Sequence, residues 1–386
     1  MMSNSDPLPS LNPLSCGRLT IDLDALKNNW RFLHAKVNET DAHDVCECAA
    51  VIKANAYGLS LENSAKTLFD TGCRNFFVAT LEEGIELRSY LENAVIYILN
   101  GLLCDQSISY INNNLYPILN NLDEVMEWSE KGQGHPAGLH VDTGMNRLGL
   151  REEDAKELAG NTALINTLNL SLIMSHLACG DTPRSLMNGC QLRGFEKIAD
   201  LYPGVRRSLA NSAGIFNGSS FHMDLVRPGI ALYGGAALKD HIDNNPMKPV
   251  VKVEACILQL REVKRHESIG YGASEVVDSD RLIATVGCGY GDGYLRHAGS
   301  STDAKGAYGF IKGHKVPLVG RVSMDLLTVD VTDVGDVKRG DYVEVFGPNV
   351  SISQLATIAE TIDYEFLTGL GHRYERIYGP LGDKNG

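Results

Sequence analysis

The sequence predicts an α/β protein made of a (β/α)8 TIM-type barrel followed by a mostly β C-terminal domain. In the first part of the chain, eight short apolar runs alternate with stretches long enough for a crossover, which is typical of parallel strands. Beyond about residue 245 helical spacing fades, and apolar residues alternate with polar ones as in antiparallel strands. We therefore expect a barrel over residues 17–245 and a β domain over 246–386. A doubly wound open sheet is the alternative for the first part.

The composition indicates a globular protein with a large core and excludes several classes of partner. The chain has 386 residues, of which 44% are hydrophobic, and a formal net charge of -13. Because no basic run exceeds two residues, neither nucleic acid nor an anionic membrane surface is expected as a partner. No apolar run reaches the length that crosses a membrane.

The cysteines and the N-terminal segment favour a cytoplasmic protein. Nine cysteines, an odd number, are scattered without a Cys-x-x-Cys pair, as expected for reduced thiols, and no metal site is predicted. Residues 1–16 are polar, carry Pro7, Pro9 and Pro13, and lack the apolar centre of a secretion signal. We expect this segment to be a mobile tail and the protein to be cytoplasmic.

The first ordered element is expected to be a strand over Arg18–Leu23, where apolar and polar residues alternate. This strand either belongs with the barrel or packs with the C-terminal domain. A helix should follow it, with Asp24 as the N-terminal cap. The apolar face of this helix consists of residues at helical spacing, namely Leu26, Trp30, Leu33 and Val37.

The eight barrel strands are identified by where their apolar runs end. The ends lie near Lys53, Ala79, Leu99, Leu119, Val141, His176, Leu209 and Val226. Amphipathic stretches lie between most of these runs, and those over residues 81–91 and 192–201 are predicted helices.

The boundary between the domains is indicated by a polar segment over residues 238–249, which contains Pro246 and Pro249. Directly after this segment, apolar and polar residues alternate strictly. The apolar residues of this pattern are Val251, Val253, Ala255 and Ile257. Such a pattern predicts a strand with one face buried, as in an antiparallel sheet.

Lys53 is the most unusual residue in the predicted barrel, because it ends a strand that is apolar on both faces. An ammonium group in that position loses hydration, which lowers its pKa and raises the neutral fraction that a nucleophile needs. The alternative is an ordinary lysine whose ammonium group reaches out of the strand end to water. Gly58, five residues later, marks where regular structure stops.

Other polar residues follow the later strands and would meet Lys53 at the carboxyl end of the barrel, where barrel enzymes carry their chemistry. The polar side chains are those of Arg147, His176, Ser212 and Arg227, and the turn after the last strand adds the backbone amides of Gly229 and Ile230. A serine at a helix start and the amides of Gly229 and Ile230 suit a phosphate group. Each residue also has an ordinary explanation, as an N-cap, a turn, a core histidine or a surface ion pair.

The sequence resembles the alanine racemase family, pyridoxal-phosphate (PLP) enzymes of fold-type III, over roughly residues 18–380. The segments that carry the resemblance are Val51-Ile52-Lys53-Ala54-Asn55-Ala56-Tyr57-Gly58, Asp142-Thr143-Gly144-Met145-Asn146-Arg147-Leu148-Gly149, Arg227-Pro228-Gly229-Ile230-Ala231-Leu232-Tyr233-Gly234, Gly270-Tyr271-Gly272-Ala273, Gly289-Tyr290-Gly291-Asp292-Gly293-Tyr294, Arg321-Val322-Ser323-Met324-Asp325 and Thr361-Ile362-Asp363-Tyr364-Glu365. In this order they are highly specific.

The resemblance implies PLP as the cofactor and assigns residues to it. Lys53 would carry PLP on its amine, Arg227 would face the pyridine nitrogen, and His176 would lie behind Arg227. The phosphate would be held by Tyr57, Ser212, Gly229, Ile230 and Tyr364.

The resemblance also implies a head-to-tail homodimer with shared active sites. Arg147 and the Met324 amide would hold the substrate carboxylate, and Met324 would come from the partner subunit. Lys53 and the partner's Tyr271 would act as two bases on opposite faces of the α-carbon. Tyr271, Tyr290, Tyr364 and Met324 would make the pocket narrow, which favours alanine as the substrate.

Three functions remain open at this point. The first is racemisation of alanine, for wall synthesis or for D-alanine breakdown, with serine or a broader substrate range as a variant. The second is decarboxylation on the same barrel, which Arg227 disfavours because such decarboxylases place a carboxylate opposite the pyridine nitrogen. The third is a non-catalytic PLP carrier, which would lack the domain that holds Tyr271 and Met324.

One position departs from the family pattern in a way that affects the site. Many relatives carry a lysine that becomes carbamylated two residues before the Asp-Thr-Gly-Met segment, and this chain has His140 there. We expect His140, with or without a bound anion or water, to orient Arg147 instead. Leu59-Ser60 and Ser323 also depart from common residues, without touching a catalytic role.

Overall fold

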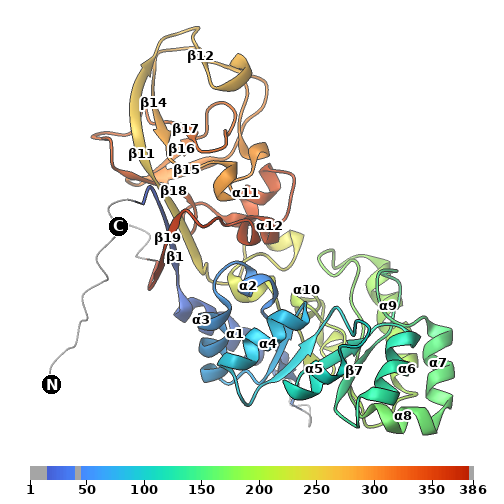
Figure 1. Cartoon of the computed structure of the whole chain (residues 1–386). Coiled ribbons are helices and arrows are strands. Elements are labelled where there is room, and N and C mark those ends of the chain that lie inside the picture. The colour runs from blue at the N-terminus through green and yellow to red at the C-terminus, as the bar shows by residue number, and fades with distance from the viewer. Residues whose placement is uncertain (1–14, 40–44, 382–386) are drawn as a thin grey trace. The chain divides into compact units, whose positions relative to one another are not determined.

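A computed structural model of the protein describes residues 15–39 and 45–381 (Figure 1). The chain forms two compact units, which are described separately below. Asp22–Val250 forms the first unit, and the described residues on either side of it form the second. The predicted tail over residues 1–16 lies outside the described residues except for Ser15 and Cys16. Both of these form hydrogen bonds, through the Ser15 hydroxyl and the Cys16 carbonyl.

The first unit is built on parallel strands that follow one another in sequence order. The strands are β2 (Glu47–Cys48), β3 (Ala50–Val51), β4 (Asn75–Val78), β5 (Val95–Ile98), β6 (Tyr116–Leu119), β7 (Ala137–His140), β8 (Leu170–Met174), β9 (Arg206–Ser208) and β10 (Leu225–Val226). β3 to β9 form one sheet, and β10 pairs with β2. All eight predicted strand ends are confirmed to within two residues.

Backbone hydrogen bonds close these strands into a barrel. On one side β10 bonds to the first strand, through Ala49 N–H to Val226 O at 2.9 Å. On the other side it bonds to the segment after β9, through Arg227 N–H to Ala210 O at 2.9 Å. The (β/α)8 prediction is therefore correct, and the open-sheet alternative is wrong.

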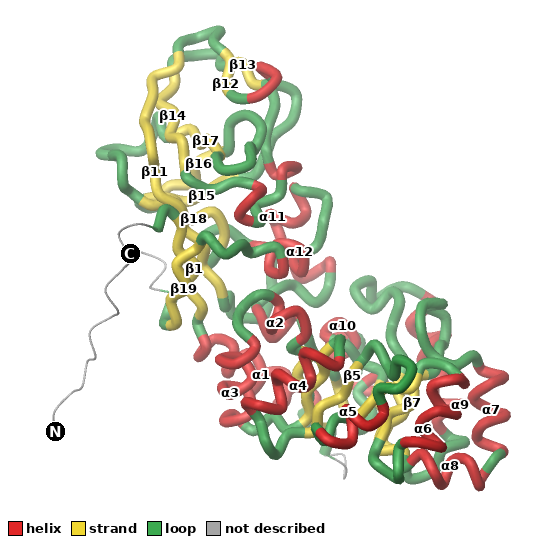
Figure 2. The backbone as a smooth tube through the Cα atoms, viewed as in Figure 1, coloured by secondary structure: helices red, strands yellow, loops and turns green. Residues whose placement is uncertain are grey.

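Helices cover the outside of the strands, as Figures 1 and 2 show. They are α1 (Leu23–Val37), α3 (Leu61–Thr71), α4 (Leu81–Tyr90), α5 (Ser107–Asn112), α6 (Leu122–Lys131), α7 (Glu152–Gly160), α8 (Thr162–Leu168), α9 (Leu186–Ala199) and α10 (Ser212–Phe216). The two helices predicted over 81–91 and 192–201 correspond to α4 and α9, although α9 begins six residues earlier.

Helix α1 has the predicted buried face but a different cap. Leu26, Trp30, Leu33 and Val37 are all buried. The predicted cap Asp24 is wrong, because Asp22 occupies the extended position before the helix and its carboxylate accepts from Ala25 N–H at 2.8 Å. Asp24 lies in the first turn and pairs with Lys27 at 2.8 Å.

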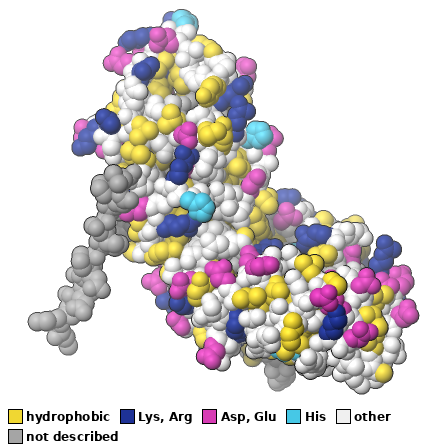
Figure 3. All heavy atoms as spheres, viewed as in Figure 1, with side chains coloured by type: hydrophobic (Ala, Val, Ile, Leu, Met, Phe, Trp, Pro, Cys, Tyr) yellow, Lys and Arg dark blue, Asp and Glu magenta, His cyan; other side chains and the backbone are white. Residues whose placement is uncertain are grey.

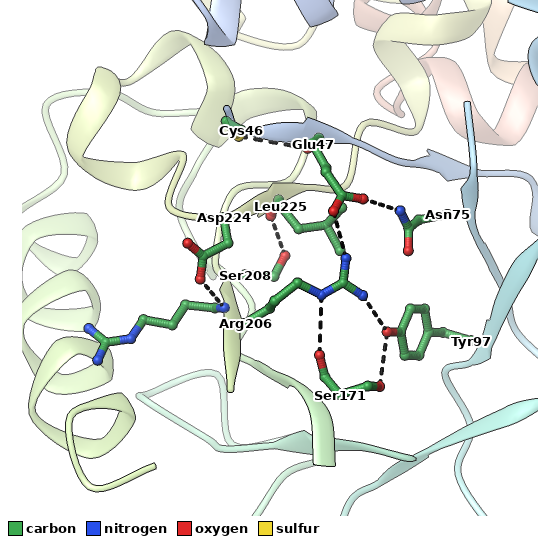
Figure 4. A network of polar contacts seen from close by, with 10 residues as sticks. Cys46, Glu47, Asn75, Tyr97, Ser171, Arg206, Ser208, Asp224 and Leu225 are labelled. Carbon is green, nitrogen blue, oxygen red and sulfur yellow. Dashed lines mark hydrogen bonds and ion pairs between the residues drawn. The ribbon is translucent and has the colours of Figure 1, made fainter. Parts of the chain in front are cut away.

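A polar network crosses the barrel near the amino ends of its strands (Figure 4). At its centre the Arg206 guanidinium donates to Glu47 Oε1 at 2.8 Å, to Tyr97 Oη at 3.0 Å and to Ser171 O at 3.3 Å. Asn75 donates to the second oxygen of Glu47. The network thereby joins β4, β5, β8 and β9 to β2 at the end of the barrel opposite to the predicted site. Residues at that end of a barrel usually contribute to stability.

We expect Arg206→Ala to lower the free energy of unfolding by about 1–3 kcal/mol without changing catalysis, because Glu47 and Tyr97 lose a charged donor. Arg207→Ala is the matched control. Among the described residues its guanidinium pairs with Asp200 at 2.9 Å near the surface and donates a long hydrogen bond to Ala199 O at 3.4 Å, so its loss should cost less than about 1 kcal/mol. Urea unfolding followed by circular dichroism measures both, and equal midpoints for the two variants would contradict this role of the network.

The second unit contains the first strand of the chain. β1 (Gly17–Ile21) pairs antiparallel with β11 (Val251–Val263) and parallel with β19 (Tyr374–Tyr378), so it lies in the C-terminal sheet. β11 shows the predicted alternation of buried and half-buried residues from Val251 onward. The other strands of this unit are β12 (Ser268–Ile269), β13 (Glu275–Val276), β14 (Arg281–Val286), β15 (Tyr308–Ile311), β16 (His314–Pro317), β17 (Leu327–Asp330) and β18 (Tyr342–Phe346).

Two short helices complete the second unit, α11 (Ile352–Ile358) and α12 (Asp363–Thr368). On the visible face of the molecule, acidic, basic and apolar side chains are interspersed (Figure 3). Among residues 15–39 and 45–381, no helix combines the length and the hydrophobicity that a membrane crossing requires.

Candidate active site

Lys53 lies just beyond the first barrel strand rather than at its end. β3 ends at Val51, and Lys53 begins α2 (Lys53–Tyr57). The four residues after Lys53 have φ between 52° and 56°, so the backbone makes a left-handed turn with no glycine in it. Such backbone costs roughly 1–2 kcal/mol per residue, and strain of this kind persists only where the surroundings impose it.

Hydrogen bonds from neighbouring segments impose this turn. The Glu83 carboxylate on α4 accepts from Ala54 N–H at 2.6 Å and from Ala79 N–H at 2.8 Å. At the other end Gly58, with φ of 83°, donates its N–H to Ala54 O at 2.8 Å. The turn therefore holds Lys53 at the carboxyl end of the strands.

The Lys53 amine has a pKa below its ordinary value. Burial is the main cause, the positive charge of Arg147 adds to it, and the negative charge of Glu83 opposes it. A lower pKa increases the neutral fraction that can act as a nucleophile or a base near neutral pH. This environment fits the chemical prediction for Lys53 better than the alternative of a fully hydrated ammonium group.

Arg147 lies in a loop that Asp142 organises. Asp142 Oδ1 accepts from Gly144 N–H at 2.8 Å and from Met145 N–H at 2.9 Å, and Oδ2 accepts from Asn146 N–H at 2.8 Å. The Arg147 side chain is exposed and forms no ion pair with any described residue. It is therefore available to an anion, and the surface ion-pair explanation finds no support.

His140 does not hydrogen-bond to Arg147 within the described residues. Its Nδ1 instead contacts Asn120 Oδ1 at 2.8 Å. Burial and the nearby charge of Arg227 lower the pKa of His140 to about 4, so the imidazole is neutral at pH 7. The expectation that His140 orients Arg147 directly is not supported by this geometry.

Arg227 is buried at 3% exposure, and no acidic side chain among the described residues pairs with it. Its guanidinium donates to the Ser208 hydroxyl, to Ser175 O at 2.6 Å and to Leu209 O at 3.4 Å. Burial lowers its pKa to about 9, which still leaves it charged at pH 7. The site thus contains a fixed cation held by neutral oxygens.

His176 is close enough to Arg227 to be affected by its charge. Burial, followed by the charges of Arg227 and Arg147, lowers the pKa of His176 to about 3, so its imidazole is neutral. Its backbone carbonyl accepts from the Gln191 side chain at 2.9 Å. No hydrogen bond joins the His176 ring to Arg227 among the described residues.

Ser212 and Gly229 form a compact set of polar groups at the carboxyl ends of β9 and β10. The Ser212 hydroxyl accepts from Gly229 N–H at 2.8 Å and from Ala231 N–H at 3.3 Å. Ser212 is not the N-cap of α10, since Asn211 is, so that alternative is wrong. Within the described part of the chain, the Ile230 N–H donates no hydrogen bond and remains available to an anion.

Tyr57 packs directly over Gly229. A Cβ atom at position 229 would lie 2.3 Å from Tyr57 Oη, so only glycine lets the phenol approach this closely. The Tyr57 ring stacks on Tyr233 with 4.5 Å between centroids, and Tyr233 Oη donates to Val51 O at 3.1 Å. Tyr57, Ser212, Gly229 and Ile230 are therefore brought together as the sequence predicted.

The remaining predicted residues lie in the second unit. Tyr271 is 71% exposed on the turn between β12 and β13, where Gly270 and Gly272 have φ of 75° and 74°. Tyr364 lies on α12 and is partly exposed. The two tyrosines are held by different elements of this unit.

Met324 and Tyr290 belong to two interlocked turns of the second unit. Tyr290 N–H donates to Ser323 O at 3.0 Å, and Gly291 N–H donates to Met324 O at 2.8 Å. The Met324 N–H has no hydrogen-bond acceptor among residues 15–39 and 45–381, and its side chain is 55% exposed. This amide can therefore donate to a ligand.

Sequence reasoning missed three residues that support the site. Glu83 holds the turn after Lys53, and the Thr80-x-x-Glu83 spacing of a capping box could have identified it. Gln191 accepts from Ala178 N–H at 2.8 Å and donates to His176 O. Arg373 links Asp292 and Asp325 at 2.6 Å each, beside Tyr290 and Met324, and only the three-dimensional structure reveals this link.

The barrel groups together define the chemistry that the site can perform. A lysine amine with a lowered pKa lies near Arg147, and the Ser212 hydroxyl together with the Ile230 N–H suits an anionic group. No cluster of three or more metal-ligand side chains exists among the described residues. These features fit an aldehyde that carries an anionic group and reacts with the amine.

Comparisons with known proteins agree with this geometry. Residues 21–237 match the family described as "Alanine racemase, N-terminal domain", and residues 250–378 match "Alanine racemase, C-terminal domain". The chain is 46% identical over 373 residues to the biosynthetic alanine racemase of Agrobacterium fabrum, covering 94% of this chain and 93% of that protein. It is 40% identical over 369 residues to the catabolic alanine racemase of the same organism, covering 94% and 92%.

A solved structure is also closely similar. The crystal structure of alanine racemase from Bartonella henselae, described as carrying covalently bound pyridoxal phosphate, superimposes with a TM-score of 0.86 at 39% sequence identity. The match covers 94% of this chain and 99% of that chain. Fold, site geometry and sequence thus agree, and the chain belongs to the alanine racemase family.

Proposed function

We propose that this protein is a PLP-dependent racemase that interconverts L-alanine and D-alanine by a two-base mechanism. The observation that carries the proposal is the Lys53 amine, whose lowered pKa and position beside Arg147 suit both covalent attachment and proton transfer. The racemases from Agrobacterium fabrum and Bartonella henselae support alanine as the substrate and PLP as the cofactor.

The barrel residues fit PLP. Lys53 would carry the cofactor on its amine, and Tyr57, Ser212, Gly229 and Ile230 would hold its phosphate, with Tyr364 as a further ligand. Tyr57 packs against Gly229, and the neighbouring Ile230 N–H, which has no acceptor among the described residues, can donate to a phosphate oxygen. When bound, PLP supplies an electron sink that makes the α-proton of the amino acid acidic.

Racemisation requires that one group removes the α-proton and another returns a proton to the opposite face. The Lys53 amine is the base on one face, because its lowered pKa provides the neutral form. The Tyr271 phenol, which is 71% exposed in the single chain, would act on the other face from the partner subunit. A single base would mostly return the proton to the face that it left.

Arg147 and the Met324 N–H would hold the substrate carboxylate. Arg147 has no ion-pair partner among the described residues, and the Met324 N–H has no acceptor there, so both can bind a carboxylate without losing another contact. Tyr290, on the turn interlocked with Met324, would narrow the pocket. A narrow pocket favours alanine, and a broader range that includes serine is the variant.

Arg227 favours racemisation over decarboxylation. A guanidinium group with a pKa of about 9 remains charged at pH 7 and does not transfer a proton to a pyridine nitrogen. Arg227 would thus leave the ring nitrogen of bound PLP unprotonated, which would limit side reactions. The hydrogen bonds from Arg227 to Ser175 O and the Ser208 hydroxyl support this fixed role, with His176 nearby as a neutral group.

The direct test is to mix the protein, PLP and L-alanine and to assay both D-alanine and carbon dioxide. We expect D-alanine to accumulate until the two enantiomers are equal, with no carbon dioxide. Carbon dioxide release without D-alanine would contradict the proposal in favour of a decarboxylase. The absence of both D-alanine and carbon dioxide would favour a non-catalytic PLP carrier. Parallel assays with serine and a basic amino acid measure substrate breadth.

We propose a homodimer in which Tyr271 and Met324 complete the partner's site. Their exposure of 71% and 55% in the single chain supports an additional covering surface. We expect the activity per subunit to fall when the enzyme is diluted below the dimer dissociation constant, with PLP kept saturating. Light scattering at each concentration reports the dimer fraction. Constant activity in a solution that contains only monomers would contradict shared sites.

The cellular setting belongs to the same proposal. All nine cysteines are free, and they lie within the described residues, which supports a reducing compartment such as the cytoplasm. D-alanine from this enzyme would serve peptidoglycan synthesis, or the reverse reaction would start D-alanine breakdown. The similar proteins of Agrobacterium fabrum include both a biosynthetic and a catabolic racemase.

A further inference from the structure

We propose that Glu83 is a positioning residue that fixes the turn carrying Lys53 and supplies a negative charge that opposes the effect of Arg147 on the Lys53 amine. The inference rests on the proposed role of Lys53 and extends it to a residue outside the segments that identified the family. Glu83 lies on α4, 30 positions after Lys53 in the chain.

The two carboxylate oxygens of Glu83 bind different segments. Oε1 accepts from Ala54 N–H at 2.6 Å, which is the first amide after Lys53. Oε2 accepts from Ala79 N–H at 2.8 Å, directly after β4. The carboxylate therefore bridges the turn after the first barrel strand to the end of the second.

A simple helix cap does not account for this arrangement. Glu83 does complete a capping box with Thr80, since the Thr80 hydroxyl accepts from Glu83 N–H at 3.3 Å. The return bond of that box, from Thr80 N–H to Glu83 Oε2, is 3.4 Å long and is the weakest of the three that the carboxylate accepts. The shorter bonds go to Ala54 and Ala79, and Ala54 is the first residue of the strained left-handed turn.

The charges around Lys53 give Glu83 a second effect. Arg147, on the loop after β7, destabilises the protonated amine, and Glu83 is the acidic group whose charge stabilises it. His176, after β8, is neutral because its pKa is about 3. Glu62 and Lys66 of α3, the helix that follows the Lys53 turn, pair with each other at 2.6 Å, so their charges largely cancel.

The test compares Glu83→Gln with Glu82→Gln as holoenzymes. Glu82 is the exposed neighbour on the same helix, so its replacement removes one charge without touching the turn. The readout is the visible absorbance of PLP bound to Lys53, followed as a function of pH. Glu83→Gln removes a negative charge that stabilises the protonated nitrogen of Lys53. We therefore expect the pH at half-change of the absorbance to fall by about 1 pH unit in Glu83→Gln and to stay at the wild-type value in Glu82→Gln.

Glu83→Asp separates the charge from the geometry. The aspartate side chain keeps the negative charge but is too short to bridge Ala54 and Ala79. We therefore expect the pH at half-change of the absorbance to stay near the wild-type value, together with faster loss of PLP on dialysis. If Glu83→Gln does not fold, a wild-type midpoint and wild-type PLP retention in Glu83→Asp would overturn the proposal. Wild-type behaviour of a folded Glu83→Gln would also overturn it, whereas a wild-type protein without racemase activity would overturn the proposed function instead.

Discussion

Lys53→Ala is expected to lose racemase activity by at least about 10³-fold and to lose the visible absorbance of bound PLP. In the proposed mechanism the Lys53 side chain supplies both the point of attachment and one of the two bases, so we expect no neighbouring group to replace it. Stopped assays of D-alanine formation and an absorbance spectrum of the purified protein measure the two effects.

Lys66→Ala is the matched control for this substitution. Lys66 is exposed on α3. Among the described residues its ammonium pairs with Glu62 at 2.6 Å and lies 5.5 Å from the centre of the Tyr90 ring, so its removal should leave both readouts unchanged. The assignment of Lys53 would be wrong if Lys53→Ala kept the visible absorbance, because another amine would then carry the cofactor.

Tyr271→Phe is expected to reduce racemisation by about 10²–10⁴-fold while leaving PLP binding intact. The substitution removes one oxygen from an exposed ring, so the fold should not change. Lys53 would still exchange the α-proton of one enantiomer with solvent, because a single base returns the proton to the face that it left. In deuterium oxide, nuclear magnetic resonance should therefore show deuterium entering one enantiomer without its conversion to the other.

Tyr90→Phe serves as the control for the loss of a phenol. Tyr90 lies at the C-terminal end of α4, and within the described part of the chain its hydroxyl donates to the exposed carboxylate of Glu86 at 3.3 Å. Its removal should leave racemisation and exchange unchanged. Equal racemisation of both enantiomers by Tyr271→Phe at the wild-type rate would remove Tyr271 as the second base.

The barrel could be predicted from the sequence because each of its strands is a local apolar run with a crossover before the next. Val141 and His176, for example, follow runs that are buried in the structure as β7 and β8. The first strand of the chain could not be assigned to a unit in this way. β1 pairs with β11, more than 200 residues away in sequence, and local periodicity carries no information about such pairing.

The details around Lys53 also lay beyond the sequence. Ala54, Asn55 and Ala56 have no shared preference for the left-handed conformation, and the carboxylate of Glu83 that holds the first of them comes from α4. Gly229 was expected to contribute a backbone amide. The reason that this position requires glycine is instead the Tyr57 phenol, which packs against it and leaves no room for a side chain. Tertiary contacts rather than local propensity decide both features.

We expect each active site to combine Lys53 of one subunit with Tyr271 of its partner. Mixing the inactive Lys53→Ala and Tyr271→Phe proteins under conditions that exchange subunits tests it directly. Half of the randomly formed dimers would be mixed, and one site in each would be intact, so we expect recovery of about a quarter of the wild-type activity. Mixed dimers that form, as shown by differently tagged subunits, but remain inactive would contradict it.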